Sequence, residues 1–140
     1  LFDKAAATLI LYPMGKTDSS YTVPSSVTSI GPYAFSNCSA LTRVVIPNSV
    51  THIEAGAFYS CTKLPAVTIP DSVTSIGSEA FKDCSALKSI TLSAGVTYIG
   101  RSAFSISESG ALTDPISGAP FSRRISLITA YMLPLHEHIL

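Results

Sequence analysis

The chain has 140 residues, of which 46% are hydrophobic and 13% are charged, and this charged fraction is about half the usual quarter. The 9 Lys and Arg residues balance the 9 Asp and Glu residues. The chain therefore has neither a basic field that would attract nucleic acid nor an acidic field that would hold cations. No apolar run approaches the roughly 18 to 20 residues of a membrane helix, so we expect no membrane insertion in this segment.

Residues 1–20 are predicted to form an N-terminal capping unit. Leu9, Leu11 and Tyr12 have the pattern of a strand, a polar loop follows up to Ser20, and residues 21–23 have the pattern of a second strand. The two segments form either a short hairpin or an incomplete coil that seals one end of a repeat array. The start of the chain shows no signal-peptide pattern, and we expect it to be a fragment of a longer protein.

A 23-residue unit recurs over residues 21–104, which are predicted to form three to four coils. A fixed period of about 20 to 29 residues with apolar positions in register is typical of a solenoid, in which each unit buries its apolar face against its neighbours. The residues therefore predict a mainly β solenoid. The repeated positions include Val27, Val50, Val73 and Val96; Ile30, Ile53, Ile76 and Ile99; and Phe35, Phe58, Phe81 and Phe104.

Each unit opens with a segment that predicts a half-buried strand of about four residues, because its apolar residues are β-branched and alternate. In one unit Val44 and Ile46 are expected to point inward, while Arg43 and Val45 point outward. A proline then removes a backbone donor, which ends strand pairing and turns the chain.

The second half of each unit holds a short extended segment, Val-Thr-x-Ile, and then a bend. Gly31, Gly77 and Gly100 stand at the bend, and Glu54 replaces them in one unit. We expect glycine at this position because the bend there suits a backbone with positive φ. A short helical or 3-10 turn is expected around Ala34–Phe35 and its copies.

The repeated pattern Leu-x-x-Val-x-Ile-Pro-x-Ser-Val-Thr-x-Ile-Gly-x-x-Ala-Phe-x-x-Cys resembles the BspA-like leucine-rich repeat, a class found in many bacterial surface proteins. Residues 21–104, which make up well over half of the chain, match it almost position by position. The resemblance implies a leucine-rich-repeat solenoid, a right-handed superhelix, exposed outside the cell at a bacterial surface. It also implies adhesion or protein binding, with a partner from the host extracellular matrix or with another cell-surface protein.

Residues 105–140 lose the repeat. Ser107 stands where Cys is expected and Gly110 where Leu is expected, and residues 105–124 are rich in Ser, Gly and Pro, which favours a loop. Residues 125–135 are apolar without a clear period. We interpret the segment as a degenerate C-terminal region that either caps the last coil or is poorly ordered. A reading frame that departs from the native one is a third interpretation.

The sequence favours no catalytic or metal site. Cys38, Cys61 and Cys84 share one repeat position, and this odd number at long, equal spacing is neither a zinc nor a disulfide pattern, so we expect buried thiols. His52 falls in an outward slot and is predicted to be plain surface. The segment 136–138, His-Glu-His, could hold a metal ion loosely but lacks the spacing and support of a built site.

No nucleophile motif, recurring acidic pair or phosphate-binding glycine loop occurs in the sequence. These observations predict a protein that is not an enzyme and that uses no cofactor. A threonine column is predicted to be structural, with hydroxyl groups that hydrogen-bond between coils. It consists of Thr28, Thr51, Thr74 and Thr97.

The outward strand positions are the predicted protein-contact surface, because alternate side chains of a strand face opposite sides. This surface is flat, small and nearly neutral, so contacts through it are expected to be weak unless many coils act together. The candidate residues are Arg43, Val45, Ala66, Thr68, Ser89 and Thr91, and Ser20 and Thr22 continue the same two columns.

These observations and the resemblance together predict a non-enzymatic protein-interaction module that acts in adhesion at a bacterial cell surface. One alternative is a structural spacer that displays another domain and has no ligand of its own. A second alternative is a glycan-binding surface, which would need exposed aromatic side chains gathered in one groove. Tyr33, Tyr59 and Tyr98 are scattered along the sequence.

Overall fold

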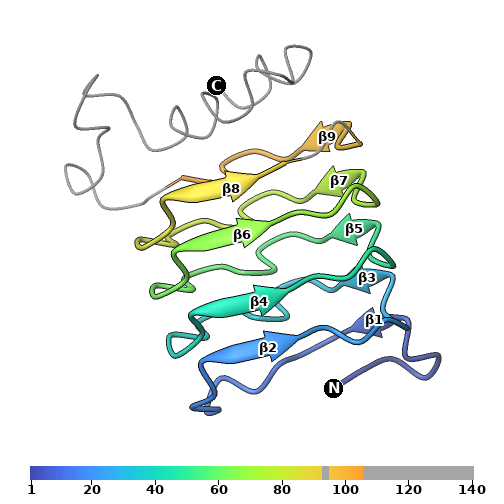
Figure 1. Ribbon diagram of the computed structural model, residues 1–140, viewed down its shortest axis with the longest axis horizontal. Helices are drawn as coiled ribbons and strands as arrows, with labels where there is room; N and C mark the ends of the chain where they lie inside the picture. Colours follow the sequence, from blue (N-terminus) through green and yellow to red (C-terminus); the bar gives the residue numbers. More distant parts are fainter. Residues whose placement is uncertain (93–94, 106–140) are drawn as a thin grey trace.

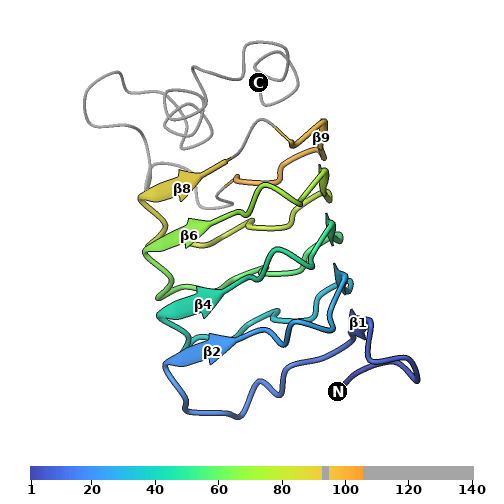
Figure 2. The same ribbon diagram turned by 45° about the vertical axis from the view of Figure 1, so that its right-hand side comes forward.

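The chain is a stack of parallel β coils. The structure is a computed structural model that describes residues 1–92 and 95–105. Its strands form two columns, with the even-numbered strands side by side in one column and the odd-numbered strands in the other (Figures 1 and 2). The strands are β1 (Thr8–Leu9), β2 (Ser20–Thr22), β3 (Ser29–Ile30), β4 (Arg43–Val45), β5 (His52–Ile53), β6 (Ala66–Thr68), β7 (Ser75–Ile76), β8 (Ser89–Thr91) and β9 (Tyr98–Ile99).

Pairing follows the repeat. The odd-numbered strands form one sheet in the order β1-β3-β5-β7-β9, and every pair in it is parallel. The register places Ile30 beside Ile53, Ile53 beside Ile76 and Ile76 beside Ile99. Each strand therefore meets its own copy in the next unit of the repeat. This confirms the predicted solenoid with short strands.

The even-numbered strands pair as β2 with β4 and β6 with β8, and a proline explains the interruption between the two pairs. Thr42 N–H donates to Ser19 O at 2.7 Å, and Lys88 N–H donates to Pro65 O at 2.9 Å. Pro65 stands at the matching position before β6 and has no N–H to donate. β6 still lies next to β4 (Figure 1), but the hydrogen-bonded ladder is broken between them.

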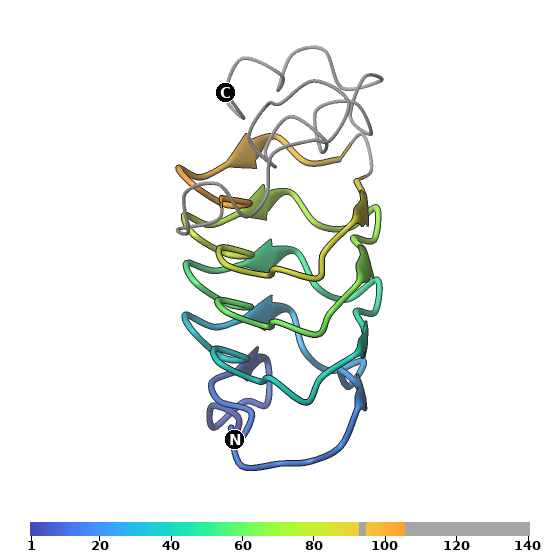
Figure 3. The ribbon, with the colours of Figure 1, turned by 90° about the vertical axis from the view of Figure 1, so that its left-hand side faces the viewer.

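The coils lie one above another along a common axis (Figure 3). The interior between them is built from columns of matching side chains of successive coils. Phe35, Phe58 and Phe81 are fully buried. Their rings stack at centroid separations of 4.9 and 5.0 Å with interplanar angles of 4° and 6°, and Phe104 follows at 5.6 Å. Parallel rings about one coil apart show that the coils are in register along the whole described array.

The segment around Ala34–Phe35 and its copies consists of hydrogen-bonded turns, and residues 1–92 and 95–105 contain no helix. Successive N–H groups alternate between two kinds of partner. Ala34 N–H donates within the coil to Gly31 O at 3.2 Å, whereas Phe35 N–H donates to Ala57 O of the next coil at 2.7 Å. Because every second amide bonds to the neighbouring coil, the expected helical turn cannot continue.

The expectation of a positive φ at Gly31, Gly77 and Gly100 is wrong, because the left-handed conformation occurs two residues later. Gly77 and Gly100 serve the bend for a different reason, and Glu54 stands at the same position of another coil. A Cβ on Gly77 or Gly100 would lie less than 3.0 Å from backbone atoms of the preceding coil. The constraint is therefore close approach of two backbones. The position with positive φ is occupied by Tyr33, Gly56, Glu79 and Ser102, at φ values of 55°, 63°, 59° and 56°.

The first coil is incomplete, and the hairpin alternative is wrong. β1 pairs with β3 and β2 pairs with β4, both in parallel. The strand expected over Leu9–Tyr12 is limited to its beginning, because Tyr12 N–H makes the turn-type bond to Ala34 O at 2.7 Å. Tyr12 occupies the position of Phe35 one repeat earlier, and its buried ring extends the aromatic stack at a centroid separation of 5.2 Å.

The outer edge of β1 is covered by residues 1–3, where Phe2 forms an antiparallel bridge with Leu9, and Asp3 satisfies two further N–H groups of the first coil. In the next coil, Thr28 N–H and Ser29 N–H both donate to Ala7 O, at 2.7 and 3.1 Å. The matching donors of the first coil are Ala7 N–H and Thr8 N–H, and they donate to Asp3 Oδ1 at 2.9 and 3.1 Å. The carboxylate thus stands where a preceding coil would supply a carbonyl oxygen. The bond from Thr8 N–H is the main cause that lowers the pKa of Asp3.

No helix within residues 1–92 and 95–105 is long and apolar enough to cross a membrane. The predictions for residues 106–140, including the loss of the repeat and the two histidines near the end, lie outside the described residues.

Replacement of Phe58 by Ala is expected to lower the free energy of unfolding by about 3 to 5 kcal/mol, because it leaves a cavity between two stacked rings. Thermal and urea unfolding followed by circular dichroism would measure the change. Thr68→Ala removes an exposed side chain and serves as the matched control. If Phe58→Ala and Thr68→Ala have equal midpoints, Phe58 does not support the core.

Asp3→Asn is expected to lower the melting temperature at neutral pH and to remove part of the acid sensitivity of the fold. The pKa of Asp3 is lowered in the folded state, so its contribution is fully present above the ordinary carboxyl pKa. It is lost as the pH falls through the lower, folded-state pKa. Melting temperatures of both proteins between pH 2 and pH 7 would test this, and parallel pH profiles would contradict it.

Candidate functional site

The outward residues of the even-numbered strands form one continuous surface, which we call the strand face. Each of β4, β6 and β8 has the burial pattern exposed–buried–exposed, so the middle residue enters the core and its two neighbours face solvent. The predicted candidate residues Arg43, Val45, Ala66, Thr68, Ser89 and Thr91 are all exposed, as are Ser20 and Thr22. These eight residues constitute the strand face.

The parallel register aligns the strand face into two columns. Ser20 lies opposite Arg43 and Thr22 lies opposite Val45 on the first pair of strands. On the second pair Ala66 lies opposite Ser89, and Thr68 opposite Thr91. The outward direction and the pairing of these residues follow from strand alternation and the 23-residue step, while their role in protein contact stays a prediction.

The chemistry of the strand face is sparse. Arg43 is its one charged residue, and Val45, 37% exposed, is its one large apolar side chain. The remaining six residues are Ser, Thr or Ala. Such a surface offers hydroxyl groups and a flat area for contact, but no group that is activated for catalysis.

The threonine column links successive coils by hydrogen bonds. Thr51 Oγ1 donates to Thr28 O at 3.1 Å, Thr74 Oγ1 to Thr51 O at 3.3 Å and Thr97 Oγ1 to Thr74 O at 3.2 Å. Each hydroxyl thus bonds to the backbone of the preceding coil. This confirms the predicted structural role.

His52 is exposed on β5, as predicted. Its Nδ1 lies 2.7 Å from Thr51 Oγ1. No group of three or more His, Cys, Asp or Glu side chains within the described residues is arranged to hold a metal ion.

The three cysteines are free and buried, as the column pattern predicted. Cys61 Sγ–H donates to Phe35 O at 3.1 Å, and Cys84 Sγ–H donates to Phe58 O at 3.0 Å. Burial raises the pKa of Cys38 to about 12. The hydrogen bond with the Cys84 thiol and burial also raise the pKa of Cys61. A high thiol pKa leaves almost no thiolate at neutral pH, so Cys38 and Cys61 act as small apolar residues.

Two of the three tyrosines that were considered for glycan binding lie together. Tyr33 and Tyr59 have ring centroids 6.3 Å apart, whereas Tyr98 lies on β9. The sequence contained a signal that was missed: the separation of Tyr33 and Tyr59 is one repeat plus three positions. In stacked coils this offset brings two residues together across the turns of neighbouring coils.

Comparison with known families and structures agrees with this geometry. A family profile described as the BspA type leucine rich repeat region matches residues 15–118 in six copies. No protein with a curated description matches the chain.

Solved structures of bacterial leucine-rich repeat proteins are similar to this chain. One from Eubacterium ventriosum is 34% identical, with a TM-score of 0.63 over 69% of this chain and 26% of its own. The T. pallidum leucine rich repeat protein is 35% identical, with a TM-score of 0.60 over 61% of this chain and 40% of its own. A leucine rich cell surface protein from Faecalibacterium prausnitzii is 29% identical, with a TM-score of 0.53 over 74% of this chain and 36% of its own. The matched segment thus spans between about a quarter and two fifths of these proteins.

The native thiols are expected to resist alkylation by iodoacetamide at pH 8, because burial and a raised pKa suppress the thiolate at Cys38 and Cys61. Mass spectrometry after timed quenching would count the modified residues. In guanidinium chloride all three cysteines should react within the same period. Rapid labelling of the native chain would show that the cysteine column is open to solvent.

Proposed function

Because this chain belongs to the family of BspA type leucine-rich repeat regions, we propose that it is a non-enzymatic protein-interaction module that acts in adhesion at a bacterial cell surface. The observation that carries the proposal is the strand face. It is an outward surface, made mostly of short side chains, that no other part of the described chain covers.

The geometry of the strand face suits a broad protein partner better than a small molecule. Its two columns are aligned by the strand register, and the short side chains leave an even surface. Small-molecule sites are concave and surround their ligand. An even, rigid surface instead complements another protein surface with little loss of conformational freedom on binding.

Affinity through the strand face depends on the number of coils. Tight interfaces are dominated by a few buried aromatic or arginine anchors, and Arg43 is the one residue of that kind on the strand face. A weak contact repeated on many coils gains affinity by multivalency. The related structures extend well beyond the segment that matches this chain, which supports a parent array with more coils.

Similarity to a protein described as a leucine rich cell surface protein supports a location at the cell surface. The repeat pattern itself supports the same location, since the resemblance to the BspA-like class points to surface proteins. The absence of an activated nucleophile or acid–base pair on the strand face is in keeping with binding as the activity of this surface.

One observation favours a structural spacer as the second candidate. The strand face has no exposed aromatic anchor, and Val45 is its one large apolar side chain. A stack of coils with so few anchors can also hold a binding domain away from the cell without contacting a ligand itself.

Introduction of two carboxylates on the strand face, Val45→Glu with Thr68→Glu, is expected to weaken binding to an extracellular-matrix protein by at least about tenfold, through desolvation and repulsion at the centre of the interface. Biolayer interferometry against immobilised fibronectin, laminin and collagen would measure it. Ser25→Glu with Thr62→Glu adds the same charge at exposed positions outside the strand face and should leave binding unchanged. Absence of binding by the folded wild type to every matrix protein would favour the spacer.

A further inference from the structure

The turns that follow the odd-numbered strands present a second surface, which we call the turn edge. Two positions of each turn, three residues apart, lie along this edge of the stack. The first row consists of Tyr33, Gly56, Glu79 and Ser102, and the second row consists of Ser36, Tyr59, Lys82 and Ser105. The turn edge is therefore aromatic at its N-terminal half and polar at its C-terminal half.

Tyr33 is held in an unusual place. It is 49% exposed although it is a large apolar side chain, and its backbone adopts a φ of 55°. The matching residues of the later coils also have a positive φ, so this conformation belongs to the repeat and is not particular to Tyr33. The ring is laid along the turn edge toward Gly56, where an added Cβ would lie less than 3.0 Å from three atoms of the Tyr33 ring.

The Tyr33 ring, and not the positive φ of the backbone, explains why position 56 is a glycine. Glu79 and Ser102 occupy the same position of later coils at φ values of 59° and 56°. The backbone conformation therefore tolerates other residues. Gly56 is needed because any side chain would push the Tyr33 ring away. The missing side chain at Gly56 leaves room for the exposed Tyr33 ring to lie against the solenoid, and we call this ring the aromatic platform.

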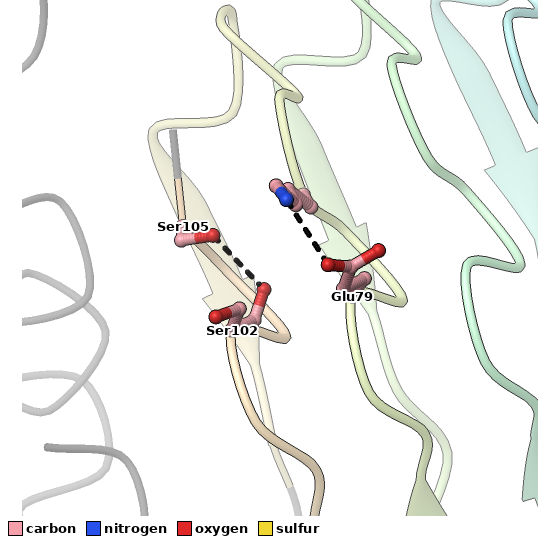
Figure 4. Close-up of polar contacts among 4 residues, drawn as sticks. Glu79, Ser102 and Ser105 are labelled. Carbon is pink, nitrogen blue, oxygen red and sulfur yellow. Dashed lines mark hydrogen bonds and ion pairs between the residues drawn. The ribbon is translucent and has the colours of Figure 1, made fainter. Parts of the chain in front are cut away.

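Polar groups lie beside this platform. The Tyr59 ring is tilted by 60° against the Tyr33 ring at a centroid separation of 6.3 Å. Lys82 occupies the position of Tyr59 on the next coil, and its Nζ bonds to the Glu79 carboxylate at 3.0 Å (Figure 4). The ion pair remains partly exposed, with 24% of the Lys82 side chain and 36% of the Glu79 side chain open to solvent.

We propose that the turn edge at Tyr33, Tyr59 and Lys82 binds a neutral oligosaccharide, with one pyranose ring stacked on Tyr33. The C–H groups on one face of a β-linked hexopyranose form an apolar patch that matches an exposed aromatic face, while its equatorial hydroxyls point sideways. Those hydroxyls need partners at the rim of the platform. Lys82 and Glu79 supply a donor and acceptors on the neighbouring coil.

Charge selects a neutral ligand. Lys82 and Glu79 form an ion pair within the turn edge, and the residues of its two rows carry no net charge. An extended β-1,4-linked chain fits this open surface because it is a flat ribbon with apolar faces. A proline-rich peptide also stacks on aromatic rings, but it presents few donors and would leave the ion pair unused.

Titration of the whole ¹⁵N-labelled chain with cellotetraose and with the N-acetylglucosamine tetramer tests the proposal. We expect shifts of the Tyr33, Tyr59 and Lys82 amide signals and a Kd on the order of 1 mM, as for a shallow site with few contacts. Tyr33→Ser should raise Kd at least about tenfold. Gly56→Ser should do the same by displacing the ring, although serine occupies the matching position at Ser102.

Tyr98→Ser is the matched control, because it removes a 56% exposed tyrosine from β9 and should leave Kd unchanged. Melting curves show that the variants are folded. Failure of both sugars to shift the wild-type signals at 20-fold excess over the expected Kd, or equal affinity of Tyr33→Ser and wild type, would overturn the proposal. Binding of decaproline to the same residues without sugar binding would overturn the choice of ligand. The strand-face variants test the protein-binding function independently.

Discussion

Backbone amides of the turns alternate between a carbonyl in their own coil and a carbonyl of the next coil, and this division sets the distance at which the coils stack. Phe58 N–H donates to Ala80 O at 2.7 Å and Phe81 N–H donates to Ala103 O at 2.6 Å, and these two donor residues carry rings that stack at 5.0 Å. Hydrogen bonds and ring contacts thus share one register. Any change that alters this register alters every column of the core at once.

The hydrogen bonds between neighbouring coils explain why the threonine and cysteine columns recur without a catalytic or binding role. Threonine hydroxyls and cysteine thiols both bond to carbonyl oxygens of the preceding coil. Buried or edge carbonyls need such partners, and the repeat supplies one per coil. At the N-terminal end, where no preceding coil is described, Asp3 supplies the acceptor instead. These residues are fixed by the stack, so the variable outward positions are the ones free to recognise a ligand.

The period alone predicted the fold, the buried columns and the strand face, because a 23-residue step and strand alternation determine which residues meet. The turns were predicted less well. Gly77 suggested a positive φ, but the structure shows that it accommodates the backbone of the coil before it, and such a contact between coils leaves no local pattern. The pair of Tyr33 and Tyr59 was missed for a related reason, since its offset is one repeat plus three positions and is visible only once the turn is known.

The two surfaces have different physical characters. The strand face is even and built from short side chains, and its contribution grows with the number of coils. The turn edge carries one ring that is fixed above a glycine and a neutralised ion pair beside it. A rigid stack holds both in place before any ligand arrives, which reduces the loss of freedom on binding. One solenoid can therefore present two independent contacts on different sides of each coil.

Native-state hydrogen exchange measured by NMR is the most direct test of the stacked coils. The amides of Phe35, Phe58 and Phe81 donate to the next coil and belong to buried residues, so their exchange should be among the slowest in the chain and should share one opening free energy. Ser25 and other exposed corner amides should exchange quickly. If the three phenylalanine amides exchange as fast as Ser25, the coils do not stack in the register described.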